Sequence, residues 1–284
     1  MAELHELLVA EVPSATVLVC GLESWIDAGF AAARARSTLT EAAALEPVAR
    51  FDADALVDHQ ARRPTMHLAD GVNTRLTWPV IELSAGTDRQ GTRFLFLSGA
   101  EPDHRWQRFS GEVVDLVRHA GVELVTALGA YPAPVPHTRP VKVVSTATTR
   151  ELADRVGYMP GELDVPAGIN AAIERACADA GVPAVGLWAQ VPHYVANFPY
   201  PASAVALLEA LERLTGLGTD RAALEGAAAD ARKRLDELVA ANPEHTQMVR
   251  QLETVYDDQS SNLTIPSGDE LAAELERFLR NQEG

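Results

Sequence analysis

Residues 16–29 read TVLVCGLESWIDAG, and this stretch decides the class of fold. Residues 16–20 are almost all apolar, which predicts a strand buried on both of its faces. A short turn with glycine and acidic residues follows, and the apolar spacing of residues 27–45 then predicts a helix. A buried strand that leads directly into a helix is the unit from which α/β proteins with parallel strands are built.

The same order of strand and helix recurs through residue 215. Short apolar runs predict four more strands, at residues 93–97, 123–128, 141–147 and 184–189. Helical spacing follows at residues 110–119, and Pro166 and Pro201 mark the first turns of two later helices. Short right-handed connections then predict a three-layer α/β/α sandwich with a mostly parallel sheet.

One region departs from this order and predicts antiparallel strands. Residues 48–57 and 66–83 alternate polar and apolar side chains around Asp70-Gly71. Alternation around an Asp-Gly pair is typical of a hairpin, which we expect at the edge of the sheet. The predicted sheet is therefore mixed.

The C-terminal part of the chain has a different composition. Beyond Gly216 it is rich in Ala, Glu, Arg and Leu, and the spacing of its leucines and alanines predicts helices. Ser267 and Glu270 form a capping-box pattern, which predicts the start of a last helix. We expect an α/β domain at residues 1–215 and a C-terminal helical appendage at residues 216–284.

The composition excludes several classes of protein. The chain has 284 residues, with 40 Asp and Glu against 24 Lys and Arg and a formal net charge of −16. Because each phosphate contact needs a basic side chain, this balance argues against nucleic acid as a partner. No apolar run reaches the roughly 20 residues of a membrane helix, and the N-terminus lacks the features of a signal peptide, so we expect no membrane insertion.

Cys20 and Cys177 lie in apolar runs and are expected to be buried free thiols in a cytoplasmic protein.

Ligands of open α/β sheets bind beyond the carboxyl ends of the strands. The predicted loops at that edge are residues 21–29, 98–104, 129–140 and 190–194. The first loop lacks the G-x-G-x-x-G spacing of a dinucleotide-binding turn, and no lysine of the chain follows glycine as in a P-loop. We favour Asp27 as the cap of the first helix, with Gly21 and Gly29 allowing a tight turn, over a catalytic Asp27.

The other loops carry groups that suit catalysis, but without a recognised spacing. Ser98 directly follows a buried strand, yet the G-x-S-x-G signature of a nucleophile is absent. A small-molecule hydrolase or nucleoside-phosphorylase-like enzyme is the alternative interpretation, with one pocket lined by Ser98, Glu101, His104, His137 and His193. The structural interpretation is a serine in a turn and imidazoles bonded to loop carbonyls. No H-E-x-x-H or C-x-x-C spacing occurs, so we expect no metal and no cofactor.

Residues 131–140 read YPAPVPHTRP and contain four prolines. Proline fixes φ and removes a backbone donor, which predicts a stiff extended loop that cannot enter the centre of a sheet. A rigid loop that presents Tyr131, His137 and Arg139 suits the binding of a partner at a low entropic cost. A structural lid whose Arg139 pairs with a surface acid is the equally weighted alternative.

Taken together, these motifs resemble the PAC2 family, the group that includes proteasome assembly chaperone 2. The resemblance spans about residues 14–215 and is carried by WIDAG at 25–29, LSG at 97–99, VPHTR at 135–139 and the segment at 188–194. The Pro-His-Thr-Arg and Pro-His-Tyr elements are similar to the actinobacterial branch of the family. Leu252-Glu253 and Tyr256-Asp257, in the C-terminal part of the chain, are also similar to that branch.

The resemblance implies a fold like that of nucleoside phosphorylases and a self-associating protein, with a trimer as one arrangement. It also implies a protein partner, with proteasome subunits as one candidate, because eukaryotic members bind proteasome α subunits. We therefore expect an assembly-chaperone-like protein without recognisable catalysis. Its expected partner-binding residues lie in the strand-end loops: Glu23, Trp25, Asp27, Ser98, Tyr131, His137, Arg139, His193 and Tyr194.

Overall fold

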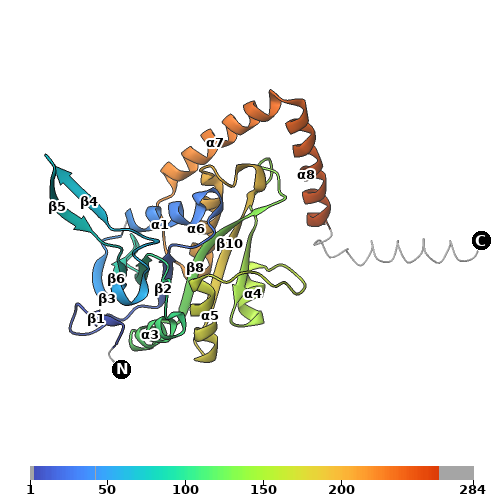
Figure 1. The fold of residues 1–284 in the computed structure, drawn as a ribbon. Helices are drawn as coiled ribbons and strands as arrows, with labels where there is room; N and C mark the ends of the chain where they lie inside the picture. Colours follow the sequence, from blue (N-terminus) through green and yellow to red (C-terminus); the bar gives the residue numbers. More distant parts are fainter. Residues whose placement is uncertain (1–2, 42, 262–284) are drawn as a thin grey trace, which may run out of the picture.

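An eight-stranded sheet organises the computed structural model, which describes residues 3–41 and 43–261 (Figure 1). The strand order is β1-β3-β6-β7-β2-β8-β10-β9. The strands are β1 His5–Leu7, β2 Val17–Leu22, β3 Glu46–Phe51, β6 Ile81–Thr87, β7 Arg93–Gly99, β8 Leu124–Ala133, β9 Val143–Ala147 and β10 Ala184–Pro192.

The centre of the sheet is parallel. Strands β7, β2, β8 and β10 pair in parallel with their neighbours, and antiparallel pairs extend the sheet on both sides of them. All residues of β2 are buried, as its continuous apolar run predicts for a strand covered on both faces. The predicted mixed α/β/α sandwich is confirmed.

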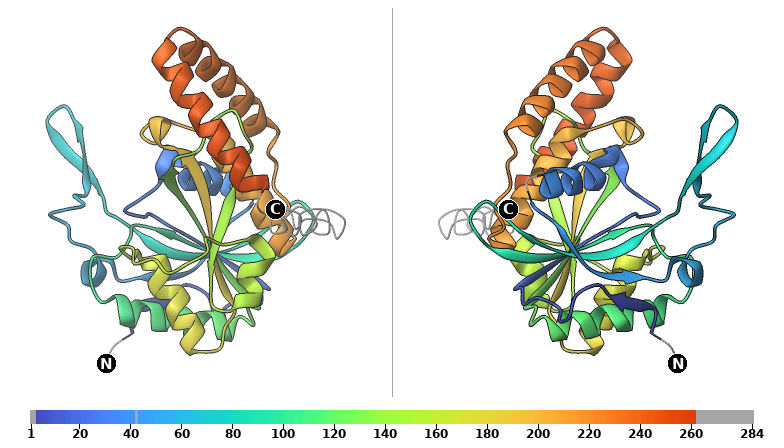
Figure 2. Two further views of the ribbon diagram at one scale, coloured as in Figure 1. Left: turned by 90° about the vertical axis from the view of Figure 1, so that its right-hand side faces the viewer. Right: turned by 90° about the vertical axis from the view of Figure 1, so that its left-hand side faces the viewer.

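Helices cover the two faces of the sheet in pairs, as the side views of Figure 2 show. Helix α1 (Ala31–Glu41) packs beside α6 (Pro201–Thr215) on one face, and α3 (Trp106–His119) packs beside α5 (Ile169–Asp179) on the other. Helix α3 turns one apolar stripe toward the strands and buries Phe109, Val113, Val114, Leu116 and Val117. Two further helices, α2 (Ala53–Leu56) and α4 (Arg150–Val156), are short.

Two of the predicted helix starts are corrected. The helix predicted from residue 27 begins only at Ala31, after a 3-10 turn, η1 (Ala28–Phe30), in which Gly29 has a left-handed φ of 65°. The helix predicted near Pro166 begins at Ile169 instead, where the buried carboxylate of Glu101 accepts a hydrogen bond from the Ile169 N–H at 2.8 Å. Pro201 is the first residue of α6, as predicted.

The proline-rich segment, predicted as a loop that cannot enter the centre of a sheet, begins as the end of strand β8. Strand β8 continues to Ala133, and Pro132 pairs with Val191 of β10. On its other side, β8 is paired with β2 only as far as Ala127. Proline is tolerated at a strand end that has one open side, because no ladder bond is lost there.

Residues 65–77 form a separate hairpin, β4 (Thr65–Ala69) and β5 (Val72–Thr77), which projects from the body (Figures 1 and 2). Its turn has φ of 49° at Asp70 and 81° at Gly71, the conformation that an Asp-Gly turn favours. The predicted hairpin is present but forms a sheet of its own, whereas β3 and β6, on either side of it in the chain, pair as the antiparallel strands predicted toward the sheet edge. No residue of β4 or β5 is buried, so the hairpin has no face to pack on the sheet.

Two long helices follow α6. Gly216 ends α6 in the left-handed conformation, and α7 (Ala222–Ala240) then packs on α6, while α8 (Pro243–Ser261) packs on α7. Figure 1 shows α7 over the top of the molecule and α8 descending beside it. These are the helices predicted beyond Gly216, and the division into domains at residues 215 and 216 stays a prediction. The helix predicted from Ser267 lies outside the described residues.

Cys20 and Cys177 are buried free thiols, as predicted. Burial raises the pKa of Cys177 to about 12, so its thiol stays protonated at neutral pH. Among the helices that the structure describes, none is long and apolar enough to cross a membrane.

The end of β7 generates a first prediction. Gly99 has a φ of 121°, and a Cβ at this position would lie 1.9 Å from the carbonyl oxygen of Val80. We expect Gly99→Ala to lower the free energy of unfolding by about 3 kcal/mol or more, because the backbone conformation and the steric overlap both oppose alanine. Urea denaturation of the purified variant measures this change.

Gly111 provides the matched control. It lies inside α3, and among the described residues no neighbouring atom beyond its own helix backbone comes within 4 Å of a Cβ placed there. Gly111→Ala is expected to raise the free energy of unfolding by about 0.5–1 kcal/mol, because alanine loses less backbone entropy in a helix. A Gly99→Ala variant as stable as the wild type would contradict the described backbone conformation of Gly99 and its close approach to Val80.

Candidate partner-binding surface

The parallel strands bring their following loops to one edge of the sheet. Strand β2 ends at Leu22 and β7 at Gly99, and the Glu23 N–H joins the two ends by donating to the Gly99 carbonyl at 2.9 Å. Strands β8 and β10 run parallel to them and end at the same edge. The candidate loops of the sequence analysis are therefore neighbours in space.

Asp27 holds the first loop by capping α1. Its two carboxylate oxygens accept hydrogen bonds from the Ala32 N–H at 2.8 Å and the Ala33 N–H at 2.9 Å. This is the capping role favoured from the sequence. The negative carboxylate also faces the positive end of the helix, which strengthens both bonds.

Gly29 ties the loop after β2 to the loop after β10. Its N–H donates to the Ala196 carbonyl at 2.7 Å, and its carbonyl accepts from the Tyr200 N–H at 2.9 Å. A Cβ at Gly29 would lie 2.8 Å from the Cβ of Tyr200. This close approach requires glycine and fixes the two loops relative to each other.

Three exposed aromatic side chains stand on these two joined loops. The exposed fractions are 55% for Trp25, 52% for Phe30 and 66% for Phe198. Phe30 also has a φ of 52°, a left-handed conformation that is costly for a bulky residue. Strained backbone of this kind concentrates at functional positions. We call these three residues the aromatic surface.

Trp25 is among the residues predicted from the sequence to bind a partner, whereas Phe30 and Phe198 are not. Phe30 falls inside the helix predicted over residues 27–45, where a phenylalanine is ordinarily a core residue. Phe198 precedes Pro199 in a loop, and an apolar residue in so short a segment gives no periodic signal.

His137 lies in a closed network beneath α7. Its backbone N–H donates to the Tyr194 hydroxyl oxygen at 2.8 Å, its Nδ1 lies 2.6 Å from the same oxygen, and its Nε2 lies 3.1 Å from Asp236. A neutral imidazole satisfies every group: Tyr194 donates to Nδ1, and Nε2–H donates to the Asp236 carboxylate. Burial accordingly lowers the pKa of His137, although Asp236 opposes this change, and burial raises the pKa of Tyr194 to about 12.

Arg139 connects the proline-rich loop to α8. Its guanidinium donates to Asp257 from Nε at 2.8 Å and from Nη2 at 2.7 Å, and Nη1 donates to Glu253 at 3.0 Å. The two parallel bonds hold the pKa of the Asp257 carboxyl below its ordinary value. Such a bidentate pair is specific in geometry as well as favourable in energy.

Other contacts fasten the same loop to α8. The Thr138 hydroxyl donates to Glu253, and the Tyr256 hydroxyl donates to the Pro140 carbonyl at 2.9 Å. The Lys142 ammonium lies 4.0 Å from the centre of the Tyr256 ring. Arg139 therefore pairs with acids, as the interpretation of this loop as a structural lid expects.

The predicted partner-binding residues thus fall into two groups. Those engaged inside the chain are Asp27, Tyr131, His137, Arg139 and Tyr194. Those exposed at the edge are Glu23, Trp25 and His193, while Ser98 is half-buried in β7.

Of the five groups of the alternative catalytic pocket, the structure brings together His137 and His193, whose rings both pack edge-on against Tyr194. Among the residues that the structure describes, no hydrogen bond joins any two of the five groups. Glu101 caps α5, and Ser98 lies in β7 between Glu82 and Gly21 of the neighbouring strands. The 310 Å³ cavity between the proline-rich loop, α6 and α7 is lined by His137 but by none of the other four. Within the described ranges, no three His, Cys, Asp or Glu side chains are grouped to hold a metal ion.

The fold and this edge define a three-layer α/β/α protein whose strand-end loops expose aromatic side chains. Residues 21–239 match the model of the PAC2 family, and the chain belongs to that family. A search of curated proteins finds no match.

Solved structures extend this comparison. A protein of unknown function from Corynebacterium glutamicum is 32% identical, with 92% of this chain and 99% of that chain covered and a TM-score of 0.84. A proteasome-assembly chaperone homologue from Mycobacterium tuberculosis is 33% identical, with 82% and 99% covered and a TM-score of 0.75. PbaB, an archaeal proteasome activator from Pyrococcus furiosus, shares the fold at 14% identity, with 82% and 97% covered and a TM-score of 0.64.

The neutral state of His137 predicts a pH-dependent stability. Its pKa is lowered by folding, so its contribution is fully present above the unfolded pKa of about 6.5 and is lost as the pH falls through the folded pKa. We expect the free energy of unfolding of the wild type to fall more steeply on acidification below pH ~6.5 than that of His137→Gln. Denaturant titrations at a series of pH values measure the two slopes.

His245→Gln is the control for this measurement, because His245 is an exposed histidine on α8. This variant should keep the slope of the wild type. If His137→Gln also keeps it, the neutral network around His137 is wrong.

Proposed function

We propose that this chain is an assembly-chaperone-like protein that binds another protein through the aromatic surface of Trp25, Phe30 and Phe198. Proteasome subunits are the proposed class of partner, and self-association of the chain is part of the proposal. The observation that carries it is the exposure of three large aromatic side chains on two loops that are fixed to each other.

Membership of the PAC2 family supports the chaperone-like role. A relative that is 33% identical over nearly its whole length is a proteasome-assembly chaperone homologue. Identity at this level over 82% of the present chain supports a related role as well as a shared fold.

The energetics of protein interfaces support the choice of surface. Aromatic side chains are enriched among the few residues that carry most of the binding energy, and burying one in a partner's pocket is worth about 2 kcal/mol or more. The bonds of Gly29 hold the loops in place before a partner arrives. Less conformational entropy is then lost on binding.

The proline-rich loop has a different part in this proposal. His137 is buried and Arg139 is paired with α8, so these side chains position the loop. Glu23 and His193 are exposed at the same edge and form the polar rim of the proposed contact.

The proposal predicts which substitutions weaken binding. Purified wild-type chain, mixed with the proteasome α subunits of its source organism, is expected to give a complex in native mass spectrometry. Trp25→Ala and Phe198→Ala should each weaken binding about 30-fold or more, which corresponds to a loss of about 2 kcal/mol. Biolayer interferometry measures the dissociation constants.

Leu238→Ala is the matched control, because Leu238 on α7 has the same exposed fraction as Phe198, 66%. It should bind like the wild type. Absence of any complex with proteasome subunits would contradict the class of partner. Unchanged affinity of both aromatic variants would contradict the surface.

A further inference from the structure

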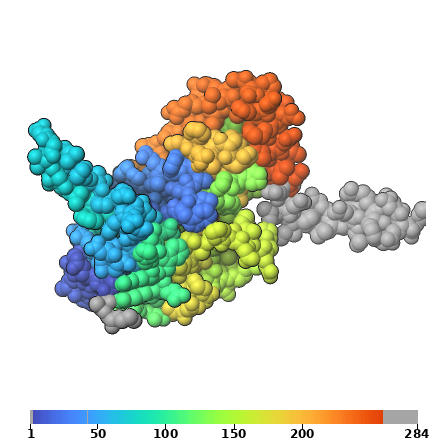
Figure 3. Space-filling view, viewed as in Figure 1, coloured from blue at the N-terminus to red at the C-terminus, as the bar shows by residue number. Residues whose placement is uncertain are grey.

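The hairpin and its flanks, residues 61–80, form an arm that stands away from the body (Figure 3). Every residue of β5 is exposed, and so are four of the five residues of β4. Its exposed large apolar side chains are Met66, Leu68, Val72, Leu76, Trp78 and Val80. Because a two-stranded hairpin alone is at best marginally stable in water, this arm needs a surface that covers it.

The arm also differs in charge from the rest of the chain. It carries Arg62, Arg63 and Arg75 against the single acid Asp70, whereas the whole chain has a net charge of −16. Within the described residues, Arg63 and Arg75 form no ion pair with an acid, and Arg75 contacts the ring of His67. The surface of the arm is therefore basic and apolar, and it is complementary in charge to a surface that is acidic and apolar.

Such a surface lies on the loop between α4 and α5. This acidic loop, residues 159–167, is exposed along its whole length. Met159, Leu163 and Val165 are its large apolar side chains, and Glu162 and Asp164 are its acids. Within the described part of the chain, neither acid forms an ion pair.

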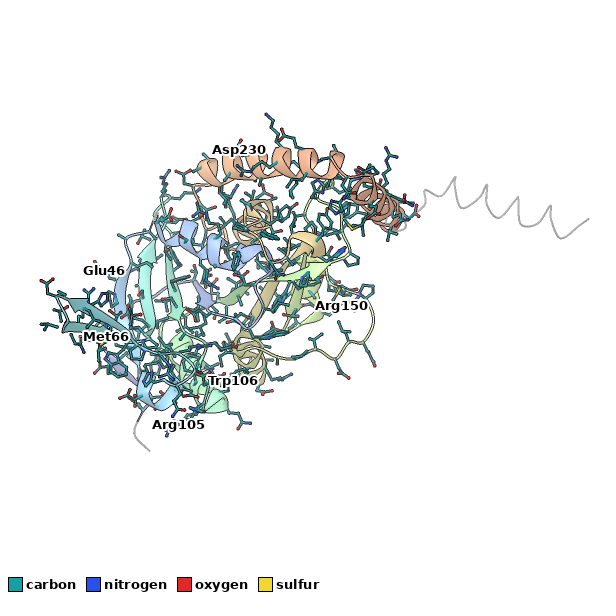
Figure 4. The ribbon with its side chains drawn as sticks, turned by 45° about the horizontal axis from the view of Figure 1, so that its top comes forward. Glu46, Met66, Arg105, Trp106, Arg150 and Asp230 are labelled. Carbon is teal, nitrogen blue, oxygen red and sulfur yellow. The ribbon has the colours of Figure 1, made fainter. Side chains whose placement is uncertain are left out.

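The arm and the acidic loop lie on opposite sides of the molecule. Figure 1 shows the arm on one flank and the loop that follows α4 on the other. Figure 4 shows the same separation between Met66, on the arm, and Arg150, the first residue of α4. The two surfaces cannot meet within one chain, but they can meet between two copies.

We propose that the arm of one copy docks on the acidic loop of a second copy. Arg63 and Arg75 then face Glu162 and Asp164, around a contact made by the apolar side chains of both segments. Because the two surfaces lie on opposite sides of the molecule, the contact is head-to-tail, and its repetition gives a ring where the rotation between copies closes and an open filament where it does not. This inference rests on the self-association included in the proposed function, and it assigns the contacting surfaces.

Charge reversal on each side tests the inference. The arm variant carries Arg63→Glu and Arg75→Glu, and the loop variant carries Glu162→Arg and Asp164→Arg. In analytical ultracentrifugation, each variant is expected to sediment as a monomer under conditions in which the wild type is oligomeric. A chain with all four substitutions restores opposite charges across the contact and is expected to regain the sedimentation of the wild type.

The control variant is Asp230→Arg with Glu237→Arg, which makes the same change of charge as the loop variant on exposed residues of α7. It should remain oligomeric. Thermal unfolding of every variant checks that the fold is kept, and the recovery in the fourfold variant cannot come from a damaged fold.

Three outcomes would overturn the inference. A monomeric wild type would refute self-association and leave partner binding to its separate test with Trp25→Ala. An oligomeric wild type with an unaffected arm variant would refute only the assigned surfaces. Dissociation of the arm variant without any effect in the loop variant would show that the arm docks elsewhere, on another part of the chain or on a different protein.

Discussion

Parallel pairing of β7, β2, β8 and β10 is the constraint on which the rest of the structure depends. Parallel neighbours cannot be joined by a tight turn, so the chain crosses the faces of the sheet between them, and the connecting helices cover the strands. All four strands then end at one edge. Trp25 and Phe198, which are far apart in the sequence, lie on loops that Gly29 joins by hydrogen bonds to Ala196 and Tyr200.

The sequence predicted this central part well, because burial on both faces leaves a continuous apolar run that few other structures produce. The sequence was less informative where the conformation of one segment depends on its contact with a segment far away in the chain. The spacing of apolar residues does not show that the pairing of β2 with β8 ends at Ala127, which allows Pro132 to be part of β8. Nor does the Asp-Gly turn show that its hairpin stands apart from the sheet, since an exposed and a half-buried hairpin share the same turn chemistry.

The contacts of the candidate site also depend on segments that are far apart in the sequence. His137 and Arg139 were recognised as unusual residues of a rigid loop, but their acid partners, Asp236 and Asp257, lie 99 and 118 positions further along the chain. The pairing joins the Pro-His-Thr-Arg element to the Tyr256-Asp257 element of α8. Phe30 was hidden for a different reason, because the left-handed φ of 52° that exposes it follows from the turn at Gly29 and not from any periodic pattern.

The span between Arg139 and Asp257 has a consequence for the order in which the molecule is completed. A chain made from its N-terminus can pair the four central strands once β10 has been synthesised, well before α8 exists. Until then the guanidinium of Arg139 lacks both of its carboxylates, although α7 already contacts the loop at His137. Closure of that loop at Arg139 therefore requires a chain that has been synthesised through α8, and a nascent or truncated chain that stops short of Glu253 lacks this closure.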